Sequence, residues 1–166
     1  MLFKKTLIRL FFIGSSIFVF CSFQTNYNDK TEQLTFIAIV DRWETIADVN
    51  YLLIKTTLTN FSSDTVTYIT MSCSWQEAYA TDTKDLVVVL NECVKNVHEL
   101  VKIPPKSRRD TVLKLISQKS VGELKGLQFR VGFNFVSAKN YDEMLSKASQ
   151  LTEMKNVIWS DTLKLN

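Results

Sequence analysis

Residues 51–75, YLLIKTTLTNFSSDTVTYITMSCSW, decide the fold class of this chain. Apolar, aromatic and β-branched residues dominate residues 51–59 and again residues 65–73, where they alternate with a period of two. That period is typical of β-strands that bury one face. Residues 60–64 supply mostly side chains that hydrogen-bond their own backbone and favour turns. The stretch therefore predicts two strands joined as an antiparallel hairpin.

Residues 1–22, MLFKKTLIRLFFIGSSIFVFCS, are organised like a secretory signal. Lys4, Lys5 and Arg9 make a positive start, and an apolar run follows from residue 10 to residue 20. This run is shorter than the about 20 apolar residues that a membrane-spanning helix needs. We therefore predict an exported protein, located in the periplasm, at the outer membrane or outside the cell.

The end of the signal allows two interpretations. Cys21 resembles the lipid-bearing first residue of bacterial lipoproteins, although Phe18 and Phe20 stand where those signals usually carry leucine and a small residue. Ordinary cleavage next to Cys21 is the alternative. A lipid on Cys21 would be the only membrane link that we expect. Residues 23–32 form a polar, flexible lead-in to a single folded domain of residues 33–166.

The basic character of the whole chain comes from the signal. The formal net charge is +3, and the signal holds Lys4, Lys5 and Arg9 but no acidic residue. Its removal leaves a mature chain without formal net charge. Because nucleic-acid binding depends on clustered cations that contact phosphates, we expect no nucleic-acid partner.

Two cysteines are left to pair if Cys21 is removed with the signal or carries a lipid: Cys73 and Cys93. An oxidising compartment would let them form a disulfide, and two separate buried thiols are the alternative. A redox-active site is not expected, because the chain has no Cys-x-x-Cys spacing.

Strand-like alternation recurs along the rest of the mature chain. It is clearest over residues 126–136, where the apolar face holds Leu127, Phe129, Val131, Phe133 and Phe135, and the opposite face is expected to meet water. Residues 43–50 are interpreted as a connection. Residues 141–154 carry apolar side chains with a helical period and begin with a capping box. About seven to nine strands with one late helix predict a mostly β chain folded as an antiparallel β-sandwich, with a closed barrel as the alternative.

Five short stretches carry a family resemblance: residues 58–66 (LTNFSSDTV), 72–75 (SCSW), 93–96 (CVKN), 103–107 (IPPKS) and 157–160 (VIWS). Their order is similar to that in a class of small exported bacterial proteins with an immunoglobulin-like β-sandwich, most of them uncharacterised. The resemblance implies fold and export and no activity. Antibody-type domains place their tryptophan on a strand between the two cysteines, whereas Cys73 and Trp75 share one strand here. Antigen-like recognition is therefore not inferred.

Residue usage argues against common catalytic sites. The chain has one histidine, His98, which excludes zinc-hydrolase spacings and histidine metal clusters. Its four glycines form no phosphate-binding loop. We therefore expect no enzyme, no cofactor and no metal.

Two places are candidates for a binding surface. Trp43 lies in the predicted connection, where an exposed aromatic ring can anchor a partner. Lys106, Arg108 and Arg109 form the one local concentration of charge, directly after two prolines, and could contact acidic partners or lipid headgroups. Trp75, Tyr79 and Tyr27 are further aromatic candidates, although Trp75 is expected to pack over the cysteine pair.

The leading hypothesis is a non-catalytic exported envelope or surface module that binds an unknown protein or glycan, or that serves a structural role. The alternative is an inhibitor or accessory subunit of a secreted enzyme, by analogy with sandwich-type proteinase inhibitors. That alternative would need a protruding loop, for which residues 103–110 are the candidate because their prolines would hold it rigid.

Overall fold

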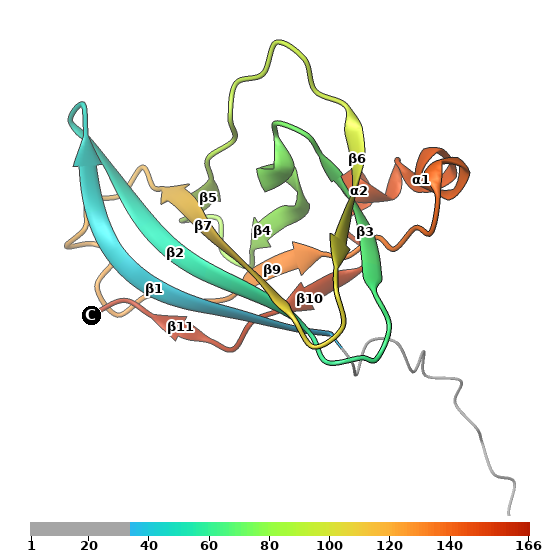
Figure 1. Cartoon of the computed structure of the whole chain (residues 1–166). Helices are drawn as coiled ribbons and strands as arrows, with labels where there is room; N and C mark the ends of the chain where they lie inside the picture. The colour runs from blue at the N-terminus through green and yellow to red at the C-terminus, as the bar shows by residue number, and fades with distance from the viewer. Residues whose placement is uncertain (1–33) are drawn as a thin grey trace, which may run out of the picture.

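The structure is a computed structural model that describes residues 34–166 (Figure 1). The predicted signal of residues 1–22, the lipidation candidate Cys21 and the predicted lead-in of residues 23–32 lie outside the described residues. The described chain is mostly β, with eleven antiparallel strands and a helical segment near the end. The predicted fold class, an antiparallel β-sandwich with a late helix, is confirmed.

The first layer is a four-stranded sheet with a long, bent hairpin at one edge (Figure 1). In sheet order its strands are β1 (Leu34–Ile46), β2 (Val49–Asn60), β7 (Arg108–Ile116) and β5 (Val87–Val88). The hairpin turns at Ala47 and Asp48, which both have positive φ, at 48° and 64°. Positive φ at both central residues is what a two-residue turn needs to match the twist of its strands.

The second layer consists of shorter ladders. They are β3 (Val66–Met71) with β6 (His98–Ile103), β9 (Val131–Asn134) between β4 (Tyr79–Thr81) and β10 (Val157–Trp159), and β8 (Gln128–Phe129) with β11 (Leu163–Lys164). The backbone bond from Ile69 N to Val136 O, 2.9 Å long, joins β3 to the continuation of β9. In three places the chain crosses this layer as two short strands with an irregular segment between them: β3 and β4, β8 and β9, and β10 and β11. The ladders are open, so the alternative of a closed barrel is wrong.

The core lies between the two layers, with aromatic rings at its centre. The ring of Phe133 in the second layer lies 5.9 Å from that of Phe36 in the first layer, and 5.3 and 5.0 Å from those of Tyr68 and Tyr79. Such tilted and edge-on pairs add to the stabilisation that burial alone gives. The apolar face predicted for residues 127–135 is therefore the core face.

The predicted hairpin of residues 51–73 is wrong in its pairing. Both halves are strands, but β2 pairs with β1 and β7, whereas β3 pairs with β6 in the other layer. Residues 61–65 cross between the layers because Asn60 is fully buried and binds several backbone groups. Its Nδ2 donates to the carbonyls of Asp64, Ile103 and Pro104 at 2.8, 3.0 and 3.1 Å.

The predicted connection over residues 43–50 is also wrong. Residues 43–46 continue β1, and Trp43 pairs with Leu52 across the ladder. The turn that separates the two strands has only two residues, Ala47 and Asp48. It lacks the glycine that usually marks such a turn, so the sequence gives little sign of it.

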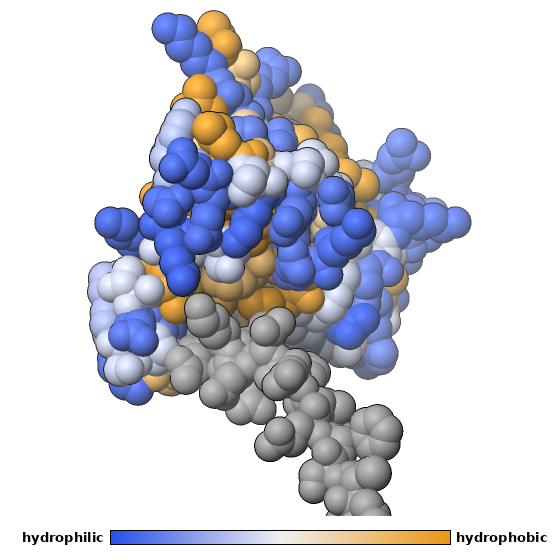
Figure 2. Space-filling view, turned by 90° about the vertical axis from the view of Figure 1, so that its right-hand side faces the viewer, coloured by the Kyte–Doolittle hydropathy of each residue, from blue (hydrophilic) through white to orange (hydrophobic). Residues whose placement is uncertain are grey.

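The predicted late helix is present in two pieces, α1 (Tyr141–Lys147) and α2 (Gln150–Glu153). Asn140 caps α1 as predicted, because its Oδ1 accepts from Glu143 N at 2.9 Å. Met144 and Leu151 pack with Ile69 on the outer face of the second layer. Figure 2 shows the side of the molecule that carries α1, which is mostly hydrophilic with apolar residues between the polar ones. Within residues 34–166, no helix is long and apolar enough to cross a membrane.

The face of residues 126–136 that was expected to meet water is partly buried. Gly132 and Asn134 are both buried. The Nδ2 of Asn134 donates to the carbonyls of Gln150 and Leu151, both at 2.9 Å, so α2 covers this part of the face. Gly132 lies against Val157 and Trp159 of β10. The prediction was wrong at these two positions because strand periodicity does not show which elements pack on the second face.

We expect Gly132→Ala to destabilise the protein. A Cβ at this position would overlap Val157 and come within 2.9 Å of the Trp159 ring. Crowding of this kind costs roughly 1 to 3 kcal/mol. Urea unfolding followed by far-ultraviolet circular dichroism would measure the loss. Gly122→Ala is the matched control, because no atom lies within 4 Å of the Cβ it would add. Equal midpoints for the two variants would contradict the packing described here.

Candidate functional site

The structure separates the predicted surface residues. Trp43 is half-buried in β1 and packs against the core, so its predicted place in a loop is wrong. On β2, the partner of Trp43 is Leu52 and the partner of Arg109 is Leu58. Six residues of strand separate the two partners by about 20 Å. Trp43 and the basic cluster therefore do not form one surface.

Strand alternation divides the basic cluster. Arg108 lies on the outer face of β7, where its Nε is 3.3 Å from Asp110 Oδ2. Arg109 has the same parity as Leu113 and Leu115, which are fully buried, and so faces the space between the layers. Of the three predicted cations, Arg109 is the one that faces the space between the layers, at its open edge.

Lys106 lies in the tight turn between β6 and β7. Its φ is 53°, and its Nζ donates to the carbonyl of Phe61. Ser107 Oγ donates to Pro104 O at 2.8 Å in the same turn. Because strands begin and end on both sides of this turn, residues 103–110 do not form the protruding loop that an inhibitor was expected to need.

A cavity of about 320 Å³ opens between the two layers along β6 and β7. β6 is the edge of the second layer, and β5 pairs only with Leu115 and Ile116, so the first half of β7 is the edge of the first layer. The two edges do not pair with each other, which leaves the sandwich open here. Aromatic rings, hydroxyls and charges line the cavity: Tyr68, Trp75, Tyr79, Phe133, Thr70, Ser72, Thr111, Glu99, Arg109 and Asp110.

Glu99 and Arg109 bring opposite charges to this cavity. Glu99 shares its strand parity with the buried Val101 and Ile103, so it points inward from β6 as Arg109 does from β7. Within residues 34–166, neither side chain forms an ion pair. Both charges are exposed and free to meet a ligand.

The aromatic wall supplies neutral phenols. Burial raises the pKa of Tyr68 to about 12, although the nearby Arg109 charge acts in the opposite direction. Burial also raises the pKa of Tyr79, against the hydrogen bonding of Thr56 and Thr111. The rings of Trp75 and Tyr79 meet edge to face, with centroids 5.8 Å apart. Both phenols therefore remain hydrogen-bond donors at neutral pH.

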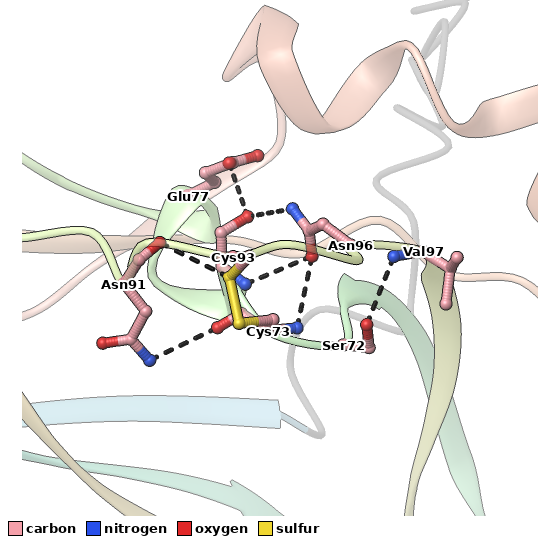
Figure 3. The surroundings of a disulfide bond; sticks show 8 residues. Ser72, Cys73, Glu77, Asn91, Cys93, Asn96 and Val97 are labelled. Carbon is pink, nitrogen blue, oxygen red and sulfur yellow. Dashed lines mark hydrogen bonds between the residues drawn. A yellow bond between two sulfur atoms is a disulfide. The ribbon is translucent and has the colours of Figure 1, made fainter.

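The predicted disulfide between Cys73 and Cys93 is present, with Cα atoms 6.1 Å apart (Figure 3). It ties the end of β3 to the loop of residues 89–97, which arches over the top of the view in Figure 1. Asn96 Oδ1 accepts from the backbone nitrogens of Cys73 and Ser74, both at 3.2 Å, and strengthens the same junction (Figure 3). The disulfide is consistent with an oxidising, exported environment.

This junction forms one side of the cavity. Ser72 and Trp75 line the cavity and lie on either side of Cys73 and Ser74. Trp75 begins a short 3-10 helix, η1 (Trp75–Ala78), which leads directly into β4. The disulfide therefore holds in place the segment that carries the tryptophan ring.

The arrangement can bind and orient a ligand. Its lining offers aromatic faces, hydroxyls, the cation of Arg109 and the carboxylate of Glu99. Asp110 also borders the cavity, but its side chain pairs with Arg108 on the outer face of β7. His98 lies at the start of β6 outside this lining, and its side chain makes no hydrogen bond with a residue of the described part. Among residues 34–166, no cluster of histidine, cysteine, aspartate and glutamate is suited to hold a metal ion.

Sequence reasoning missed Tyr68 and Glu99 as site residues. Tyr68 was assigned only to a strand, and nothing local distinguishes it from a core aromatic residue. Glu99 precedes Val101 and Ile103 at an interval of two. A charged residue on the apolar face of a strand was the signal that could have found it.

Loss of the disulfide should destabilise the protein. We expect the double variant Cys73→Ser/Cys93→Ser to lose about 3 kcal/mol of unfolding free energy, since the bridge closes a loop with a sequence separation of 20. Urea unfolding would measure the loss. Mass spectrometry of the non-reduced exported protein should find both residues in one cross-linked peptide, and two free thiols would contradict the pairing.

Stability should fall at high pH because of Tyr68. Its folded pKa of about 12 lies above the ordinary value of 10.0, so the folded state retains a proton that the unfolded state loses. The resulting stabilisation is complete below pH 10 and disappears as the pH rises toward 12. The urea midpoint of unfolding would be measured from about pH 9 to about pH 12. Over this range it should fall less for Tyr68→Phe than for the wild type. Tyr141→Phe, at an exposed ring, is the control and should behave like the wild type.

Comparisons with known proteins add little. The chain matches no protein-family model and no curated protein. Among solved structures, it is similar to the crystal structure of the yjhA protein from Bacillus subtilis, with 13% sequence identity and a TM-score of 0.41. The match covers 81% of this chain and 92% of that one.

Proposed function

We propose that this protein is a non-catalytic exported module of the cell envelope or surface, and that it binds its partner at the cavity between β6 and β7. The partner is a protein or a glycan. One observation carries the proposal: Arg109 and Glu99 face an aromatic cavity and form no ion pair within the described residues. Arginine, tryptophan and tyrosine are the residue types that most often dominate binding energy.

Export is the second part of the proposal. It rests on the signal-like residues 1–22 and on the disulfide between Cys73 and Cys93, which fits an oxidising compartment. A lipid on Cys21 would hold the module at a membrane. The intact mass of the mature protein, isolated from the envelope, would test both points, because it reports the first residue and any attached lipid.

A second candidate function is an inhibitor or accessory subunit of a secreted enzyme. The loop of residues 89–97 supports it better than residues 103–110, because the disulfide fixes this loop at Cys93. The next residue, Val94, is fully exposed. Loss of inhibition of a secreted protease on substitution of Val94 by aspartate would favour this function over binding at the cavity.

A pair of matched variants tests the proposed site. The tagged full-length chain, exported by its own cells, would be used to capture partners from the envelope fraction. We expect Arg109→Gln to lose the captured partner and Arg108→Gln to keep it. Both variants remove one positive charge from adjacent residues, but only Arg109 faces the cavity. Equal capture by the two variants, or no capture by the wild type, would contradict the proposal.

A further inference from the structure

The cavity between β6 and β7 has the size and lining of a site for a small polar ligand. Its volume of about 320 Å³ lies near the lower end of the range for small-molecule sites, roughly 300 to 1,000 Å³. Such sites combine apolar and aromatic walls with a few placed polar groups. Tyr68, Trp75 and Phe133 supply the wall here, and Glu99 and Arg109 supply the charges.

The charges restrict the chemistry of the ligand. Arg109 extends from the first layer and Glu99 from the second, so the two opposite charges enter the cavity from different sides. Among the ion pairs of residues 34–166, none joins these two side chains. Water solvates both exposed charges in the free protein, so a neutral ligand would pair with neither of them, and an anion or a cation would pair with only one. A ligand with both signs of charge satisfies both.

We propose that the cavity binds a zwitterionic amino acid or a very short peptide with an aromatic or branched apolar side chain. The guanidinium of Arg109 would hold the carboxylate through paired hydrogen bonds, for which its planar geometry is suited. Glu99 would accept hydrogen bonds from the ammonium group. The side chain of the ligand would lie against the rings of Trp75 and Tyr79.

This inference rests on the proposed function and makes its ligand specific. The hydroxyls of Thr70 and Ser72 lie on the β3 side of the cavity and that of Thr111 lies on β7. These groups can hydrogen-bond the polar atoms that lie between the two charged ends of the ligand. The disulfide at Cys73 keeps Ser72 and Trp75 in place before the ligand binds. A site that is ordered in advance loses less entropy on binding.

Singly charged analogues provide the test. The probes are L-phenylalanine, N-acetyl-L-phenylalanine, which lacks the ammonium, and L-phenylalaninamide, which lacks the carboxylate. The dipeptide leucyl-phenylalanine and glucose complete the panel. Binding would be measured by calorimetry on the full chain and by the fluorescence of its tryptophans. We expect L-phenylalanine or the dipeptide to bind at least about tenfold more tightly than either singly charged analogue.

Two variants test which charged group of the ligand each residue binds. Arg109→Gln should weaken the binding of L-phenylalanine about tenfold and leave the binding of L-phenylalaninamide unchanged. Glu99→Gln should weaken the binding of L-phenylalanine and leave the binding of N-acetyl-L-phenylalanine unchanged. A variant that merely disturbed the fold would weaken all ligands alike. Arg108→Gln, which removes the same charge from the outer face of β7, should bind like the wild type.

Three outcomes would overturn the inference: no binding of any zwitterion at millimolar concentration, equal binding of the zwitterion and its analogues, or binding of glucose in preference to both. If the envelope partner is captured in an Arg109-dependent way while no zwitterion binds, the inference fails and the proposed function stands. If neither occurs, both fail.

Discussion

The buried amide of Asn60 is the interaction on which the arrangement of the two layers depends. Asn60 has no exposed surface, and its side chain binds the crossing after β2 and the crossing after β6 at the same time. Its Oδ1 also accepts from the backbone nitrogen and the hydroxyl of Ser62, at 2.9 and 2.6 Å. Both ends of its side-chain amide are therefore hydrogen-bonded inside the protein. A buried amide without such partners would carry a large desolvation penalty, so this network specifies one path for the chain.

The open cavity is a consequence of that path. The chain leaves β6, turns at Pro104 and Ser107, and enters β7 in the opposite layer. β6 and the first half of β7 thus become edges that face each other across the core without pairing. Inward-pointing charges on edge strands also discourage pairing with other chains, so Glu99 and Arg109 can serve solubility as well as recognition. The aromatic rings beside these charges belong to the core between the layers, and the cavity gives a ligand of the proposed kind access to them.

The disulfide acts on the same region from the other end of β3. β3 begins just after the Asn60 network and ends two residues before Cys73, so both of its ends are fixed. Between them, β3 presents Tyr68 and Thr70 to the cavity and Ile69 to the helical segment. A strand that is covered on both faces and fixed at both ends is a rigid support for a binding site. The loop of residues 89–97 is held by the disulfide and by Asn96, and its residues are mostly exposed.

The sequence alone determined the cap at Asn140 and the core face of residues 127–135, because each depends on residue type and spacing within a short segment. It favoured a β-sandwich and a disulfide between Cys73 and Cys93, but a closed barrel and two separate thiols remained open until the tertiary structure brought the strands and the two cysteines together. The site depended on tertiary structure. The alternation around Arg109 shows that it and Arg108 point in opposite directions, but not which of them faces the core. Glu99 and Arg109 became neighbours of one cavity only because Asn60 directs β2 and β3 into different layers, and local sequence equally allowed a hairpin. Pairing between distant strands is set by the packing of the whole domain, which no segment encodes by itself.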